Sequence, residues 1–134
     1  MPNPSEMDLD AGIITKVRSG TVGDAVARLT DLIESRGMKV FTIVDHSGEA
    51  KEHGLELRDT KLVIFGSPVA GTPVMVASPL AALDLPLKVL VWDQDGQTSI
   101  SYTDPVALAA RHHLTDDLAA RLAGIGPLTD ALIA

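Results

Sequence analysis

The amino-acid sequence predicts an α+β fold, in which a mainly antiparallel sheet of about five strands packs against helices in two layers. Strand-like runs at 61–65, 85–92 and 98–103 dominate the second half of the chain, with helix-like segments gathered before and after them. The connection between residues 92 and 98 is too short for the crossover that two parallel strands require. We therefore expect these last two strands to pair antiparallel.

The first third of the chain predicts a strand, a helix and a second strand. Residues 12–19 alternate in polarity, as in a half-exposed strand. Thr21 and Asp24 have the spacing of a capping box, and Gly37 is placed to end the helix that follows. The β-branched run at 39–45 predicts the next strand. The apolar face of the predicted helix consists of Val22, Val26, Leu29 and Ile33.

The middle of the chain is divided by serine, threonine, glycine and proline. We expect a short helix at 49–53, capped by Ser47. Apolar residues occupy both faces of the strand-like run 61–65, which predicts a central strand that is covered on both sides. Thr72 followed by proline predicts the start of a longer helix, which Pro79 interrupts.

The C-terminal part predicts a hairpin followed by short helices. Asp95-Gly96 lies between two strand-like runs and indicates a hairpin with a loop of about four residues. Asp104, followed by proline, begins a helix that extends to about residue 112. Thr115 caps a last helix to about residue 123, and a terminal turn follows at 128–133.

Charge and composition argue against several classes of protein. The net charge of the 134 residues is -7, so the chain lacks the cations that nucleic-acid binding requires. The absence of cysteine excludes disulfides, thiolate catalysis and iron–sulfur clusters. Residues 1–11 are polar and resemble no signal peptide, and no apolar run reaches the ~18 residues that span a bilayer. We therefore expect a cytoplasmic protein without a nucleic-acid or membrane partner, with a flexible tail at 1–11 and a single domain at 12–134.

Three stretches resemble a bacterial and archaeal family known as domain of unknown function 302. They are Ile64-Phe65-Gly66-Ser67-Pro68, Gly71-Thr72-Pro73-Val74-Met75, and the string PLAALDLPLKVLVW at 79–92. Asp45-His46 and Tyr102-x-Asp104-Pro105 stand where that family has them, and the resemblance covers about residues 12–133. Two positions depart from the family pattern, since Ser67 replaces the usual asparagine and Asp59 a common proline.

The resemblance implies a compact α+β domain with a curved sheet of the TATA-binding-protein-like type, commonly found as a homodimer. This fold label carries no DNA-binding function, because function resides in sites and not in folds. The family has no established reaction, so the resemblance supplies neither catalytic residues nor a cofactor.

Asp45 and His46 are the candidate catalytic residues. A carboxylate and an imidazole at the end of a strand can orient each other as acid–base groups, and His46 would then line a pocket. Alternatively, Asp45 caps the following turn and His46 bonds to the backbone. His112 and His113 are about 100° apart on a helix, so both cannot easily bind one metal ion, and no metal site is expected.

Four further residues are candidates for binding a ligand. Lys88 interrupts an apolar strand, and it either extends to the sheet edge or projects into a concave face to hold an acidic ligand. Strand alternation places Trp92 on the side of Lys88, and we expect Tyr102 to join them around one cleft near Asp45-His46. The N–H groups after Thr72 could hold an anion at a helix N-terminus, although cap and turn chemistry explains the same residues.

These observations favour a homodimeric module that binds a small anionic or apolar ligand or has a regulatory role. The second interpretation is an enzyme that uses Asp45 and His46 as an acid–base pair on a small acidic substrate. The third is a structural subunit whose apolar strands and helices form a protein interface.

Overall fold

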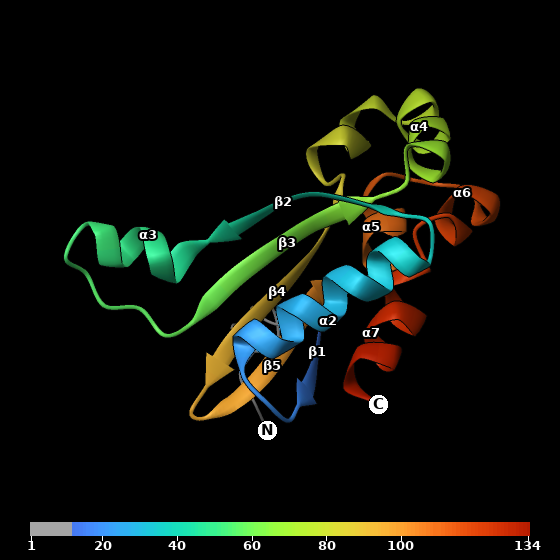
Figure 1. Ribbon diagram of the computed structural model, residues 1–134. Coiled ribbons are helices and arrows are strands. Elements are labelled where there is room, and N and C mark those ends of the chain that lie inside the picture. The colour runs from blue at the N-terminus through green and yellow to red at the C-terminus, as the bar shows by residue number, and fades with distance from the viewer. Residues whose placement is uncertain (1–11) are drawn as a thin grey trace, which may run out of the picture.

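The computed structural model describes residues 12–134, in which five strands form one antiparallel sheet (Figure 1). The strands are β1 (Ile13–Arg18), β2 (Lys39–Asp45), β3 (Thr60–Gly66), β4 (Leu87–Gln94) and β5 (Gln97–Thr103). Their order across the sheet is β1-β5-β4-β3-β2, and every neighbouring pair is antiparallel. The predicted α+β class is therefore confirmed. The predicted tail at 1–11 lies outside the described residues.

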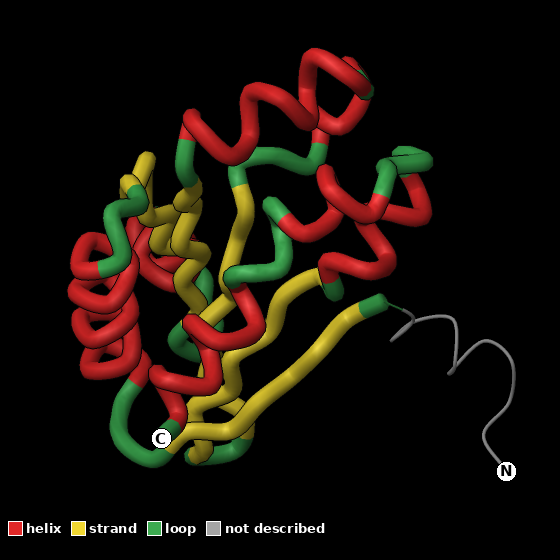
Figure 2. Tube along the Cα trace, turned by 90° about the vertical axis from the view of Figure 1, so that its right-hand side faces the viewer, coloured by secondary structure: helices red, strands yellow, loops and turns green. Residues whose placement is uncertain are grey.

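Helices lie on one side of this sheet and beyond both of its ends (Figure 1, Figure 2). They are α2 (Val22–Ser35), α3 (His46–Glu52), α4 (Pro68–Ala77), the 3-10 helix η1 (Pro79–Leu83), α5 (Pro105–Arg111), α6 (Asp116–Ala120) and α7 (Ile125–Ile133). The long helix α2 crosses the sheet, and α7 lies beside it (Figure 1). Helices α4, η1, α5 and α6 enclose a second, smaller apolar cluster beyond the end of the strands.

The main core lies between the sheet and helices α2 and α7. The four apolar positions predicted for α2 are all buried in it, and Phe65 and Val89 meet them from the sheet with no exposed area. Side chains with this degree of burial supply the largest share of the stability of a domain of this size. The core therefore fixes β3 and β4, the two strands whose ends position the candidate site.

Local capping follows the predicted chemistry at several places. The Thr21 hydroxyl accepts the Asp24 N–H at 3.0 Å and the Asp24 carboxylate accepts the Thr21 N–H at 3.5 Å, which completes the capping box of α2. The Asp104 carboxylate accepts the Val106 N–H at 3.0 Å at the start of α5. The predicted interruption at Pro79 is confirmed, since α4 ends at Ala77 and η1 begins at Pro79.

The sheet face that points away from α2 and α7 is called the open face here. It carries Ile13 and Val17 of β1, which are each half exposed, together with alternate residues of the central strands, among them Ile64, Leu90 and Trp92. The prediction that β3 is covered on both faces is wrong for this side. Its apolar residues here are only partly buried, because α2 and α7 both lie on the opposite face.

Three other local predictions are corrected by the structure. The helix expected to start at Thr72 begins at Pro68, because the Ser67 hydroxyl caps it by accepting the Ala70 N–H at 3.3 Å. Helix α3 is capped by Asp45 instead of Ser47 and spans His46–Glu52. The segment expected as a terminal turn is the helix α7.

The β4–β5 hairpin is tighter than predicted. Its turn is the two residues Asp95 and Gly96, whose φ angles are 53° and 90°. Positive φ at both central residues is the requirement of a type I′ turn, whose twist suits paired strands. This turn sets the register in which Trp92 faces Ser99.

No helix in residues 12–134 combines the length and apolar character that crossing a bilayer would require.

Candidate functional site

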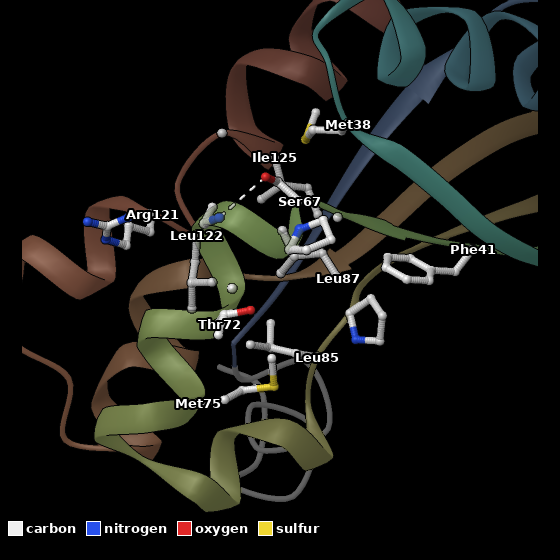
Figure 3. A pocket seen from close by; sticks show the side chains of 16 residues that line it. Met38, Phe41, Ser67, Thr72, Met75, Leu85, Leu87, Arg121, Leu122 and Ile125 are labelled. Atoms are coloured by element: carbon white, nitrogen blue, oxygen red, sulfur yellow. Dashed lines mark hydrogen bonds between the residues drawn. The ribbon is translucent and has the colours of Figure 1, made fainter.

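An apolar cavity of about 330 Å³ lies at the end of the sheet where the two hydrophobic clusters meet (Figure 3). Helix α4 forms one wall through Gly71, Thr72 and Met75, and the segment Leu85-Pro86-Leu87 forms the wall opposite. Met38 and Phe41 close the side toward β2. The α6–α7 connection contributes Leu122, and the start of α7 contributes Ile125. The cavity is within the ~300–1,000 Å³ range of small-molecule sites.

Glycines in and beside α4 keep this space open. Gly71 lies inside the helix, and a Cβ atom there would point at Leu85 and Met75, 4.0 Å from both. Gly66, the last residue of β3, would direct a Cβ toward Pro86 at 3.7 Å and toward the Phe41 ring at 3.9 Å. Side chains larger than alanine at these two positions would therefore enter the cavity.

The polar groups at the cavity are few and mostly engaged. The Ser67 hydroxyl accepts the Ala70 N–H, and the Thr72 side chain lies exposed in the middle of α4. Arg121 contributes its stem, while its guanidinium points away from the other lining side chains in Figure 3. The lining is therefore suited to an uncharged apolar molecule. Because α4 begins at Pro68, the helix N-terminus that Thr72 was expected to provide is not there.

Asp45 and His46 lie at the far end of β2, away from this cavity. The Asp45 Oδ1 accepts the Gly48 N–H and the Ser47 hydroxyl, each at 2.9 Å, and caps α3. The Gly48 hydrogen bond, followed by that of Ser47, holds the pKa of Asp45 below its ordinary value of 3.8. His46 is exposed and does not line the apolar cavity. Their catalytic role stays a prediction.

Lys88 and Trp92 share the open face, as strand alternation predicts. The Lys88 ammonium donates to the Pro86 carbonyl at 2.9 Å and approaches that of Asp84 at 3.5 Å. The Trp92 indole N–H donates to the Ser101 hydroxyl at 3.0 Å, and Arg58 lies 5.9 Å from the centre of its ring.

Tyr102 does not join them, so the predicted single cleft is wrong. It is 5% exposed and belongs to the core beneath α2 and α7, because β5 pairs Ser99 with Trp92 and turns Tyr102 to the opposite face. The expected meeting of Lys88 with Asp45-His46 is also wrong. Asp45 pairs with Lys61 near one end of β3, whereas Lys88 pairs with Ile64 near the other.

A carboxylate–imidazole pair does exist, but between residues 28 positions apart. His112 Nε2 lies 2.6 Å from Asp84 Oδ2, and Arg111 Nη1 contacts both oxygens of the same carboxylate at 3.1 and 3.3 Å. The His112 hydrogen bond, reinforced by Arg111, holds the pKa of Asp84 below its ordinary value of 3.8. This cluster ties the loop before β4 to the end of α5. No local spacing in the sequence indicated it.

Fold and site together define an α+β domain that carries a preformed apolar cavity at one end of its sheet. Comparison with solved structures supports the fold. The chain is similar to the crystal structure of an uncharacterized conserved DUF302 protein from Bacillus stearothermophilus, with a TM-score of 0.78 and 20% identity over 92% of this chain and 96% of that one.

Residues 13–127 match the family described as Domain of unknown function DUF302. The chain belongs to this family, as the resemblance in its sequence predicted.

Curated relatives carry a more specific name. The chain is 39% identical over 131 residues to proteins of Brucella suis and Brucella abortus that are each named Fluoride-specific ion channel FluC 1. The match covers 94% of this chain but 52% and 48% of those proteins. The chain therefore spans about half the length of the curated relatives it matches.

Proposed function

We propose that this protein is a homodimeric module that binds a small, uncharged, apolar molecule in the cavity between α4 and Leu85-Pro86-Leu87. The cavity itself carries the proposal, since its size is that of a ligand site and its lining is apolar. A space of this kind inside a well-packed protein forfeits dispersion contacts unless a ligand restores them. We also propose a cytoplasmic location, which the absence of cysteine supports.

Filling the cavity from α4 is expected to abolish ligand binding while leaving the fold intact. In Gly71→Leu the new side chain starts 4.0 Å from Leu85 and Met75 and grows into the cavity, and loss of a helical glycine favours α4. We expect the affinity for the neutral fluorescent probe N-phenyl-1-naphthylamine to fall at least about tenfold, or about 1.4 kcal/mol. Titration of the probe, with circular dichroism of the variant, measures this.

Ala77→Leu is the matched control, because it adds the same side chain to the exposed end of α4, outside the cavity. We expect it to bind the probe as the unaltered protein does. The proposal fails if the unaltered protein gives no saturable fluorescence increase, or if folded Gly71→Leu binds the probe equally well.

A second candidate function is regulation of an ion channel, favoured by the 39% identity to the two Brucella proteins named fluoride-specific ion channels. The half of those relatives that this chain does not match is about as long as the chain itself. We propose that the unmatched half conducts the ion and that the shared half adjusts conduction when its apolar cavity is filled.

Removing the shared half from the Brucella suis protein is expected to preserve fluoride efflux from reconstituted vesicles but to abolish any response of that efflux to N-phenyl-1-naphthylamine. Vesicles without protein control for effects of the probe on the bilayer. A response that persists in the shortened protein, or an intact protein that does not respond, contradicts the regulatory role.

A further inference from the structure

A second cavity, of about 240 Å³, lies between the end of η1, the start of β4 and α5, and has a different chemical character from the first. Leu83 and Leu108 give it apolar walls, while Lys88, Thr103 and Asp84 bring polar groups to it. Leu87 and Ile125 line both cavities, so two side chains separate them.

Lys88 is a half-buried cation that lines this cavity. Its ammonium donates to the Pro86 carbonyl at 2.9 Å and lies 3.5 Å from that of Asp84. Within residues 12–134 no aspartate or glutamate oxygen lies within 4.0 Å of it. An ammonium has three hydrogens, so one donor remains after the two carbonyls are counted. Charges withdrawn from water are ordinarily paired, which makes the missing counter-charge the notable feature of the site.

Asp84, which also lines this cavity, does not fill this role. The Asp84 carboxylate is held by His112 at 2.6 Å and by Arg111 at 3.1 Å, and its negative charge is already matched by the arginine. With Lys88 included, the cluster has a local excess of positive charge in a chain whose net charge is -7. This positive charge would attract an anion into the cavity.

Thr103 supplies a second donor. It is half buried, lines the cavity, and its hydroxyl makes no hydrogen bond with other residues in the described part of the chain. We propose that Lys88 and Thr103 bind the carboxylate of a short-chain organic acid, whose alkyl part lies against Leu83 and Leu108. This site is independent of the apolar ligand proposed above, because it uses a charge that the first cavity lacks.

Titration with sodium butyrate, followed by amide chemical shifts at constant ionic strength, tests this assignment. We expect saturable shifts around Lys88 and Thr103 in the unaltered protein, and an affinity at least about tenfold weaker in Lys88→Met, which keeps the length of the stem but loses the charge. Thr103→Val, which removes only the hydroxyl, should weaken binding less. Lys51→Met removes a lysine from exposed α3 and should bind as the unaltered protein does.

Sodium chloride and sodium acetate distinguish the class of anion. Chloride is expected to compete poorly, because it cannot use the apolar walls, and acetate to bind more weakly than butyrate. The proposal is overturned if butyrate causes no saturable shift, if Lys88→Met binds it unchanged, or if chloride competes as well as butyrate. If Lys88→Met fails to fold, Lys88→Gln, which also removes the charge but keeps a polar end, is expected to show the same loss of affinity, and unchanged binding in it overturns the proposal.

Discussion

Replacing Leu90 with glutamate is expected to dissociate the proposed homodimer into monomers. Leu90 lies at the middle of β4, the central strand, and its side chain is on the open face beside Trp92. Two copies that meet through this face would enclose the new carboxylates in an apolar contact, where desolvation of a charge without a partner is costly. We expect the dimer dissociation constant to rise at least about a hundredfold, or about 2.7 kcal/mol.

The dimensions of the open face are adequate for such a contact. Five strands about 4.8 Å apart and six to eight residues long form a face of about 24 by 23 Å, on the order of 550 Å². Two copies would bury about 1,100 Å², which is above the ~1,000 Å² that separates biological interfaces from incidental ones. Of the residues that β3, β4 and β5 turn to this face, Lys88 alone is charged, so two acidic chains would meet here with little repulsion.

Light scattering coupled to size exclusion measures the outcome. The unaltered protein is expected at twice the 14.1 kDa mass of the chain, and Leu90→Glu at the mass of one chain. Leu55→Glu places the same charge on a leucine that is 65% exposed outside the sheet, and it should remain dimeric. A monomeric unaltered protein, or a dimeric Leu90→Glu variant, contradicts the proposed dimer.

The sequence predicted the fold well because its signals are local. The capping box at Thr21, the apolar spacing of α2, the Asp-Gly turn and Asp104-Pro105 each act within four residues, and the structure contains all of them. The start of α4 was missed because Ser67-Pro68 and Thr72-Pro73 are both cap-and-proline pairs. The chain uses the first pair, which places Val74 inside the helix with no exposed area.

The site was less predictable because it depends on register and on distant contacts. The predicted strands end at Trp92 and begin again at Thr98, and pairing these two residues would put Tyr102 on the face of Trp92. The structure pairs Trp92 with Ser99 instead, and a shift of one residue turns every side chain of a strand to the other face. For this reason Tyr102 was expected beside Trp92 but lies in the core. The cavity has one local signal that was overlooked, the charge-free segment 66–83, in which glycine and small residues replace the polar positions of an ordinary surface helix.

Replacing Asp84 is expected to have the second large effect, and one that depends on pH. In Asp84→Ala the hydrogen bonds to His112 and Arg111 are lost, and we expect the free energy of unfolding at pH 7 to fall by about 1–2 kcal/mol. This is the lower part of the range for charged hydrogen bonds, because the Asp84 side chain is 25% exposed and Arg111 is largely in water.

The sign of the pH dependence follows from the lowered pKa of Asp84. A carboxyl group that is more acidic in the folded than in the unfolded protein stabilises the fold above its unfolded pKa, and this stabilisation is lost as the pH falls through the folded pKa. The difference in unfolding free energy between the unaltered protein and Asp84→Asn should therefore be constant near neutral pH and shrink below about pH 4.

Urea unfolding from pH 7 to pH 3 measures this difference, and the subtraction removes the parallel contribution of Asp45, whose pKa is also lowered. A difference in unfolding free energy that stays constant from pH 7 to pH 3 would show that the Asp84 carboxylate does not stabilise the fold.

Because Asp84 directly precedes Leu85, a wall of the apolar cavity, the same variants should bind N-phenyl-1-naphthylamine more weakly. If Asp84→Asn loses affinity for the probe at urea concentrations below its unfolding midpoint, where the variant is still folded, then the contact of Asp84 with the end of α5 holds the cavity in its binding form.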